Sequence, residues 1–268
     1  MLFDTHCHLT FDDLAPQVEA VLQRAHEGGV ERVINVATTL DDARAGRELQ
    51  KTFDNVDLAV GIHPHEAGKC TRDDLDQLAA LHRGEGDAEG DFRPPVAVGE
   101  TGLDFHYDFA PRERQEEVFR FHVELASELR RPLVIHARKA EQRVCDILAD
   151  CPQLEGRFVF HCYSAGIDTA RRILDLGGRL SFTGVVTFKN AETVRQAARY
   201  TPRERIMVET DAPYLSPEPM RKVFPNEPAF VVHTARFLAE LRGESFTNFA
   251  EATTANAIEF FDLTGDRT

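Results

Sequence analysis

The stretch Asp4-Thr5-His6-Cys7-His8 ends the first apolar run of the chain, and similar runs followed by polar side chains recur along the sequence. The run predicts a strand over Leu2–His6, and alternate residues of a strand point to the same side. His6 and His8 can therefore offer two imidazoles to one point while Cys7 faces away. Neutral imidazole is a common ligand of zinc and other transition metals. Two histidines alone leave a coordination sphere incomplete and also suit ordinary surface positions, so further ligands must be sought elsewhere in the chain.

Apolar runs alternate with amphipathic stretches, a pattern typical of an α/β protein with repeated βα units and a parallel sheet. Eight such units predict a (β/α)8 TIM barrel with one or two extra C-terminal helices, in one domain over residues 1–268, although a split open sheet fits the same periodicity. Arg83–Pro95, rich in glycine and charge, indicates a surface connection. The expected strands are Leu2–His6, Glu31–Ala37, Asp57–His63, Val96–Glu100, Leu133–His136, Arg157–His161, Arg179–Phe182 and Ile206–Glu209. The expected helices are Pro16–Glu27, Asp41–Phe53, Arg72–Arg83, Arg112–Arg130, Ala140–Ala149, Ile167–Leu176, Ala191–Tyr200, Phe230–Leu241 and one or two within Phe246–Phe261.

Composition restricts where the protein works and what it binds. The five cysteines are scattered without a CxxC pair, which suits reduced thiols better than disulfides. No apolar run approaches the roughly 20 residues of a membrane span, and Met1 leads directly into a strand, so we expect a cytoplasmic protein without a membrane partner. The formal net charge of −14 argues against a broad surface that coats nucleic acid. A polyanionic substrate must therefore be held locally.

Residues that commonly bind metals stand at the ends of six of the expected strands. Barrel enzymes place their chemistry at the carboxyl ends of the strands, where these side chains would converge. Each residue alone has a structural alternative, because a histidine can be a hydrogen-bonded polar residue and a carboxylate can cap a helix. Together they predict a metal site at the barrel mouth. They are His6, His8, His63, His65, Glu100, His136, His161 and Asp211.

Six motifs carry a resemblance to a known family and extend over essentially the whole chain. They are Asp-Thr-His-Cys-His at 4–8, Gly-Ile-His-Pro-His at 61–65, Gly-Glu-Thr-Gly-Leu-Asp at 99–104, Ile-His-Ala-Arg at 135–138, Phe-His-Cys-Tyr-Ser at 160–164 and Glu-Thr-Asp-Ala-Pro-Tyr-Leu at 209–215. In their order and spacing the sequence resembles the TatD family of metal-dependent deoxyribonucleases, within the amidohydrolase-like barrels. The resemblance implies a barrel with two divalent ions, Mg, Mn or Zn, and phosphodiester hydrolysis.

The resemblance also implies roles for individual residues. His6, His8 and Asp211 would bind one ion, His136 and His161 the other, and Glu100 would bridge the two. His63 and His65 would lie on the substrate side. Arg221, which precedes Asn226-Glu227-Pro228 as in the family, would join them.

The chemistry of these residue types agrees with phosphodiester hydrolysis. Two divalent ions bring four positive charges and the two carboxylates return two, so the site would attract phosphate. Ions about 3.5–4 Å apart can acidify a water and stabilise the leaving oxygen. Asp211 would be a general base or only a ligand, and Arg138 would hold a phosphate or simply face solvent.

The expected function is a deoxyribonuclease acting on single-stranded or frayed DNA ends, with RNA as a further substrate and no obligate protein partner. A concave barrel mouth suits a strand end, while the 3′→5′ direction comes only from the resemblance. A deacylase, amidase or lactonase with the same metal pair is an alternative. Against it, many amidohydrolase-like barrels bridge their metals with a modified lysine, whereas Glu100 resembles the nuclease branch. A binding scaffold without turnover is a further alternative, opposed by the complete ligand set.

Overall fold

The computed structural model describes residues 1–85 and 93–263 of the chain. Within that part, eight strands form one sheet in the order β1 to β8, and each neighbouring pair is parallel. Residues 86–92, inside the expected connection Arg83–Pro95, lie outside the described residues. The strands are β1 Leu2–Cys7, β2 Val30–Ala37, β3 Val56–Val60, β4 Ala97–Asp104, β5 Leu133–Arg138, β6 Phe158–Phe160, β7 Arg179–Phe182 and β8 Ile206–Val208.

The sheet closes where the segment after β8 meets β1. Cys7 and Ala212 form an isolated parallel bridge. On either side of it, the Asp211 amide donates to the His6 carbonyl at 2.9 Å and the His8 amide donates to the Ala212 carbonyl at 2.8 Å. The predicted barrel is thereby confirmed over an open sheet, and closure itself brings Asp211 beside His6 and His8.

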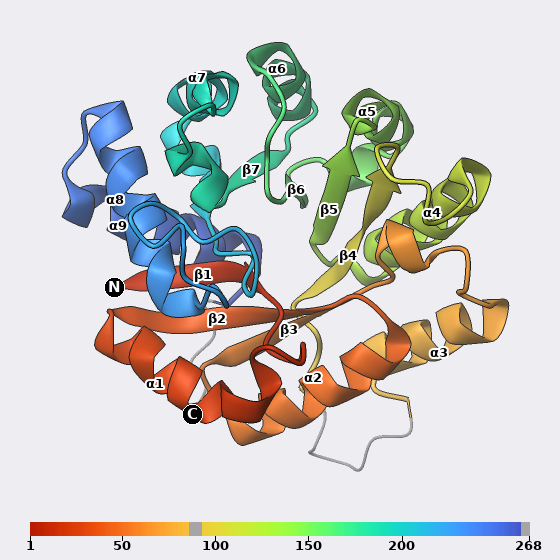
Figure 1. Ribbon diagram of the computed structural model, residues 1–268. Coiled ribbons are helices and arrows are strands. Elements are labelled where there is room, and N and C mark those ends of the chain that lie inside the picture. Colours follow the sequence, from red (N-terminus) through yellow and green to blue (C-terminus); the bar gives the residue numbers. More distant parts are fainter. Residues whose placement is uncertain (86–92, 264–268) are drawn as a thin grey trace.

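The helices lie around the outside of the strands, as Figure 1 shows. Their ends follow local chemistry: α3 begins with a capping box between Thr71 and Asp74 and ends at Gly84, whose φ of 73° suits glycine. A single helix, α9, occupies the C-terminal stretch where one or two were expected. No helix in the described ranges is both long and apolar enough to cross a membrane. The helices are α1 Val18–Glu27, α2 Leu40–Thr52, α3 Arg72–Arg83, α4 Arg112–Leu129, α5 Glu141–Ala149, α6 Ile167–Asp175, α7 Glu192–Tyr200, α8 Val231–Arg242 and α9 Phe246–Phe260.

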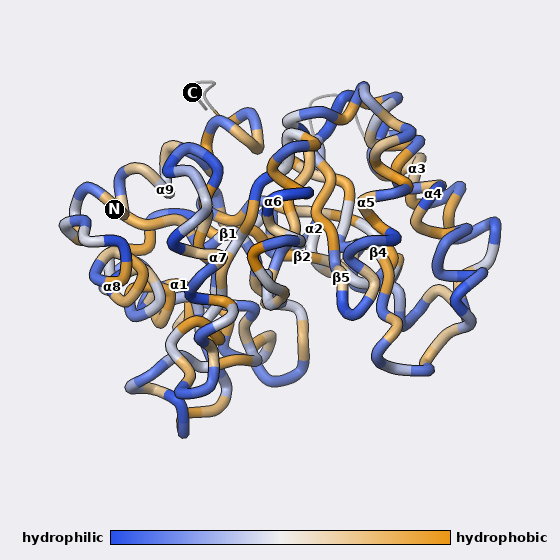
Figure 2. Tube along the Cα trace, turned by 90° about the horizontal axis from the view of Figure 1, so that it is seen from above, coloured by the Kyte–Doolittle hydropathy of each residue, from blue (hydrophilic) through white to orange (hydrophobic). Residues whose placement is uncertain are grey.

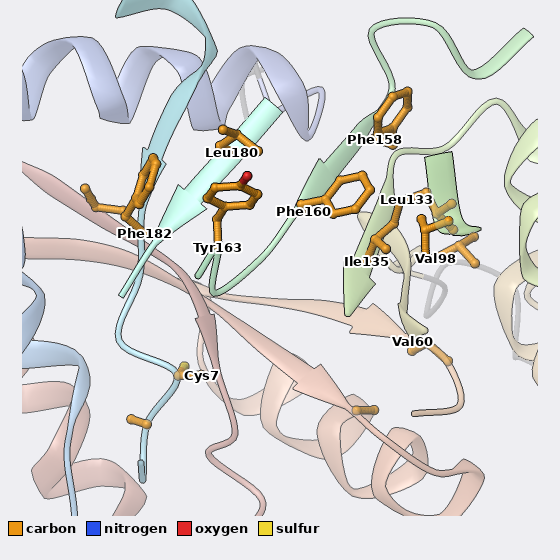
Figure 3. Packing of buried hydrophobic residues seen from close by; sticks show 14 of the residues in the cluster. Cys7, Val60, Val98, Leu133, Ile135, Phe158, Phe160, Tyr163, Leu180 and Phe182 are labelled. Atoms are coloured by element: carbon orange, nitrogen blue, oxygen red, sulfur yellow. The ribbon is translucent and has the colours of Figure 1, made fainter. Parts of the chain in front are cut away.

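Two apolar clusters hold the barrel together. The larger packs strands against surrounding helices, and Figure 3 shows its members Val98, Ile135 and Phe160 on neighbouring strands. In the smaller, residues of β1 to β6 and β8 contact one another and α9, which is possible only across the barrel interior. In Figure 2 the central strands are coloured mostly as hydrophobic, while the helices alternate between hydrophobic and hydrophilic residues. The interior is therefore filled by side chains, and α9 packs against that filling through residues such as Phe260.

Two strands, β3 and β4, end three and four residues away from the expected positions, while the ends of the other six differ by two residues or fewer. β3 stops at Val60, so His63 lies in the following loop, where its amide donates to the Thr38 carbonyl at 3.0 Å. β4 continues past Glu100 to Asp104, because it pairs with β5 as far as Arg138. The continuation requires Gly102, whose φ is 143° and where a Cβ would lie 2.0 Å from the His136 carbonyl oxygen.

Candidate metal centre

The candidate ligands form the uppermost layer of the barrel interior. Val134 belongs to the inner cluster, so His136, two residues later on β5, also points inward. The same alternation relates Val159 of β6 to His161. Because alternate residues of a strand point to the same side, the polar ligands lie directly above the inner apolar cluster, at the carboxyl ends of the strands.

Glu100 lies at the centre of this layer, and its two oxygens face different histidines. Oε1 lies 2.7 Å from His161 Nε2 and 3.0 Å from His136 Nδ1. Oε2 lies 3.4 Å from His6 Nε2 and 3.9 Å from His8 Nε2. A carboxylate with one oxygen toward each histidine pair has the geometry of a bridging ligand between two cations.

His8 shows why positive charge belongs here. Its Nδ1–H donates to the Val36 carbonyl at 2.8 Å, so the neutral ring has a lone pair on Nε2. That lone pair faces Asp211 Oδ1 at 3.4 Å as well as the nearer oxygen of Glu100. Acceptors that face one another repel unless a proton or a metal ion lies between them, and the residues present fit the latter.

His6 and His161 give the second test of that fit. Their rings stack with centroids 4.0 Å apart and an interplanar angle of 11°. Both are buried, yet in the described part of the chain none of their ring nitrogens has an aligned hydrogen-bond partner. Buried polar nitrogens are normally satisfied, so unpaired ones near carboxylates indicate ligand atoms for cations.

The electrostatics of the layer agree with this assignment. Burial by itself would raise the pKa of Glu100, but His161, His63 and His136 together hold it well below its usual range. Burial opposes charge on His161, yet the charges of Glu100 and Glu209 raise its pKa well above its usual range. The pKa of Asp211 is lowered, because His8 and the other histidines outweigh burial. The carboxylates are therefore ionised at neutral pH and favour positive charge between them.

His63 and His65, expected on the substrate side, adjoin the layer. His63 Nε2 lies 3.3 Å from His136 Nδ1 and 3.4 Å from Glu100 Oε1, and burial lowers the pKa of His63 to about 4. His65 Nε2 lies 2.8 Å from Asp104 Oδ2. His63, His65 and His136 also have ring nitrogens close enough to share a cation.

Two carboxylates that were quoted in the motifs but given no role belong to the centre. Asp104 Oδ2 lies 3.2 Å from His136 Nε2, so it orients that ring from the side away from Glu100. Glu209 Oε1 accepts a hydrogen bond from the Cys162 amide at 2.6 Å and lies 3.4 Å from His161 Nδ1. The sequence signal for both was their position, because Asp104 and Glu209 stand four and two residues from Glu100 and Asp211 in the same motifs; that position marks them as candidates without assigning a role.

Arg138 and Arg221 lie outside the ligand layer, although both were expected to contact substrate. Both are exposed, and in the described ranges neither forms a salt bridge. The Arg138 guanidinium lies 5.0 Å from the Tyr107 ring centroid, and that of Arg221 lies 4.1 Å from the Phe188 ring centroid.

Comparison with known proteins identifies the family. A family model described as TatD related DNase matches residues 3–262. The chain belongs to the TatD family. It is 38% identical to the uncharacterized metal-dependent hydrolase YcfH of Escherichia coli (strain K12), with 99% of this chain and 97% of that protein covered. It is 29% identical to a TatD of Citrobacter rodentium (strain ICC168) named as a 3′-5′ ssDNA/RNA exonuclease, with 98% of each chain covered.

A solved TatD structure has the same fold. The crystal structure of YJJV, a TatD homolog from Escherichia coli K12, matches with a TM-score of 0.89 and 29% identity, covering 97% of this chain and 98% of that one. The resemblance noted in the sequence is confirmed. This TatD chain is therefore a metal-dependent hydrolase that acts on ester bonds.

Proposed function

We propose that this chain removes nucleotides from the 3′ ends of single-stranded or frayed DNA, and also of RNA, with two divalent metal ions. His6, His8 and Asp211 would hold one ion, His136 and His161 would hold the other, and Glu100 would serve both. The observation that carries the proposal is that the two Glu100 oxygens face separate histidine pairs. The name of the Citrobacter rodentium relative supports the substrate and the direction.

The ions would supply Lewis acidity, which acidifies a water and neutralises charge on the phosphate. The residues of the chain supply position and proton transfer. Asp211 accepts the proton of the attacking water, because its side chain is 15% exposed while that of Glu100 is 3% exposed. The hydrogen bond from the Asp211 amide to the His6 carbonyl positions the base, Asp104 orients the His136 ring, and Glu209 lies beside Nδ1 of His161. Arg138 binds a phosphate oxygen beside the reaction centre.

A strand end fits this site better than the middle of a strand. The ligand layer lies inside the barrel, below the loops that follow the strands, so a phosphate must enter from above. A net charge of −14 gives a duplex no extended basic track to lie along. The chain thus favours a flexible single strand whose end can enter the barrel.

The test is a metal-reconstitution assay with defined DNA ends. Protein stripped of metal is reloaded with Mg²⁺, Mn²⁺ or Zn²⁺ and given linear and circular single strands of the same sequence, alongside duplex and RNA. We expect mononucleotides from the 3′ end of the linear strand, an intact circle, and two ions per chain by elemental analysis. Rapid cutting of the circle, or mid-length fragments before mononucleotides, would refute end recognition.

The same assay includes small carboxylic esters, amides and lactones. Polarised oxygen and an acidified water serve acyl transfer as well as phosphoryl transfer. Turnover of these compounds far above that of DNA would replace the nuclease proposal with the hydrolase alternative.

A further inference from the structure

Three aromatic rings continue the candidate metal centre toward solvent. We call His65, Tyr107 and Phe109 the aromatic shelf. The Phe109 ring lies 4.6 Å from that of His65, and Tyr107 lies 5.4 Å from Phe109. His65 in turn lies 4.4 Å from His63, whose Nε2 is 3.4 Å from Glu100. The shelf is therefore connected to the centre through direct ring contacts.

The outer part of the shelf is unusually open for aromatic residues. Phe109 is 65% exposed and Tyr107 is 39% exposed. Single exposed apolar side chains are common, but adjoining ones beside a catalytic centre indicate a binding surface. The Arg138 guanidinium, 5.0 Å from the Tyr107 ring, adds positive charge at the same edge.

The segment that carries Tyr107 and Phe109 is anchored by hydrogen bonds at both of its ends. Asp104 Oδ1 accepts the amides of His106 and Tyr107 at 2.8 and 3.1 Å. The buried Gln115 side chain accepts a hydrogen bond from the Asp104 amide at 2.8 Å and donates one to the Ala110 carbonyl at 2.9 Å. Both ends of the segment are thus fixed, and the rings need little ordering when a ligand binds.

We propose that the aromatic shelf is a base-stacking subsite, in which Phe109 and Tyr107 hold a nucleobase of the single strand whose phosphate occupies the metal centre. This inference rests on the proposed nuclease function and deepens it. Every nucleobase has a π-face, so stacking binds a strand without selecting its sequence.

Charge explains why this chain needs such a subsite. Nucleic-acid affinity usually comes from many phosphate contacts by Lys and Arg, which a protein with net charge −14 can provide only locally. Stacking supplies affinity that does not depend on charge. It also favours single strands, because bases within a duplex are already stacked and paired.

The first test measures binding without cleavage. Three DNA oligonucleotides carry 2-aminopurine at the last, second or third position from the 3′ end, with phosphorothioate linkages that resist hydrolysis. Stacking should quench the fluorescence of at least one of them on wild-type protein. Phe109→Leu, which keeps apolar bulk but removes the ring, should abolish that quenching and raise Kd about tenfold or more. Phe109→Tyr should preserve it.

A matched control lies at the opposite end of the barrel, where α7 leads into the amino end of β8. Tyr200, at the end of α7, is 45% exposed and carries the Arg171 guanidinium 5.1 Å from its ring, much as Tyr107 carries Arg138. Tyr200→Ala should change neither quenching nor Kd. Far-UV circular dichroism and the Tm confirm that each variant is folded.

The second test separates this inference from the nuclease proposal. Phe109→Leu should raise KM about tenfold on an intact strand but behave like wild type on a strand whose last three nucleotides lack bases. If DNA is cleaved and Phe109→Leu alters neither KM nor quenching, the shelf is refuted while the nuclease proposal stands. If no DNA is cleaved but quenching still requires Phe109, the shelf stands and the nuclease proposal fails. Absence of quenching at all three positions also refutes the shelf.

Discussion

His82, far in sequence from every candidate ligand, makes the stability of this protein sensitive to acid. The ring is fully buried on α3, where Nε2–H donates to the Val60 carbonyl at 3.0 Å. Its Nδ1 accepts a hydrogen bond from the Arg131 guanidinium at 2.9 Å. A second proton would have to sit on Nδ1, directly against that cation. Burial, assisted by the charge of Arg131, accordingly lowers the pKa of His82 to about 3.

The sign and size of the effect follow from linkage. The folded protein keeps His82 neutral, whereas the unfolded chain binds a proton below the ordinary pKa of 6.5, so stability falls as pH falls through that value. At pH 5 the unfolded ring is almost fully protonated and the folded ring is not. With about 1.4 kcal/mol per pKa unit, His82 should lower the free energy of unfolding by about 2 kcal/mol between pH 7.5 and pH 5.

The perturbation is His82→Gln, whose amide can still donate to the Val60 carbonyl but does not titrate. Urea unfolding at pH 7.5 and pH 5 gives two free energies for each protein. The wild type should lose about 2 kcal/mol more than the variant over this interval, whatever the variant costs at pH 7.5. His26→Gln, which replaces a largely exposed histidine, is the control and should show the wild-type difference. Equal pH dependence in wild type and His82→Gln would refute the reasoning.

Three further substitutions test the centre and the strand that carries it. Glu100→Gln should lower hydrolysis by more than about a hundredfold and reduce bound metal, because the bridging charge is lost; two retained ions with near-native turnover would contradict this. Asp211→Asn should lower the rate more than the metal content measured by elemental analysis, whereas proportional losses would indicate a ligand only. Gly102→Ala should lower the free energy of unfolding by about 2–4 kcal/mol in urea, because its φ is 143° and the new Cβ meets the His136 carbonyl; wild-type stability would show that β4 adjusts.

The barrel was predictable because its strands and helices carry clear periodicity. Every expected helix and strand forms, and α3 has the predicted bounds. Strand ends were less accurate, since β4 contains two glycines that interrupt the apolar pattern although its pairing with β5 continues. Periodicity describes which face is buried and does not report where a neighbouring strand stops offering hydrogen bonds.

The candidate ligands were identifiable because parallel strands bring their carboxyl ends to one edge of a barrel. Distances within the centre were not, because closure of β1 against the segment after β8 decides how near Asp211 comes to His8. Asp104 and Glu209 were left without roles for a related reason. Each faces a ring nitrogen that Glu100 does not face, and such contacts depend on side-chain directions that spacing alone does not specify.

Asp104 is a single buried carboxylate that contacts both the candidate metal centre and the aromatic shelf. Its Oδ2 lies against the rings of His65 and His136, while its Oδ1 accepts the amides of His106 and Tyr107. Burial by itself would raise the pKa of Asp104, but these contacts hold it well below its usual range, so the carboxylate is ionised and can accept all of them. The extension of β4 to Asp104 is what places it there. The extra strand residues thereby connect the candidate metal centre to the aromatic shelf. Their path requires a glycine at position 102, which pairs with His136 of β5 and leaves no room for a Cβ.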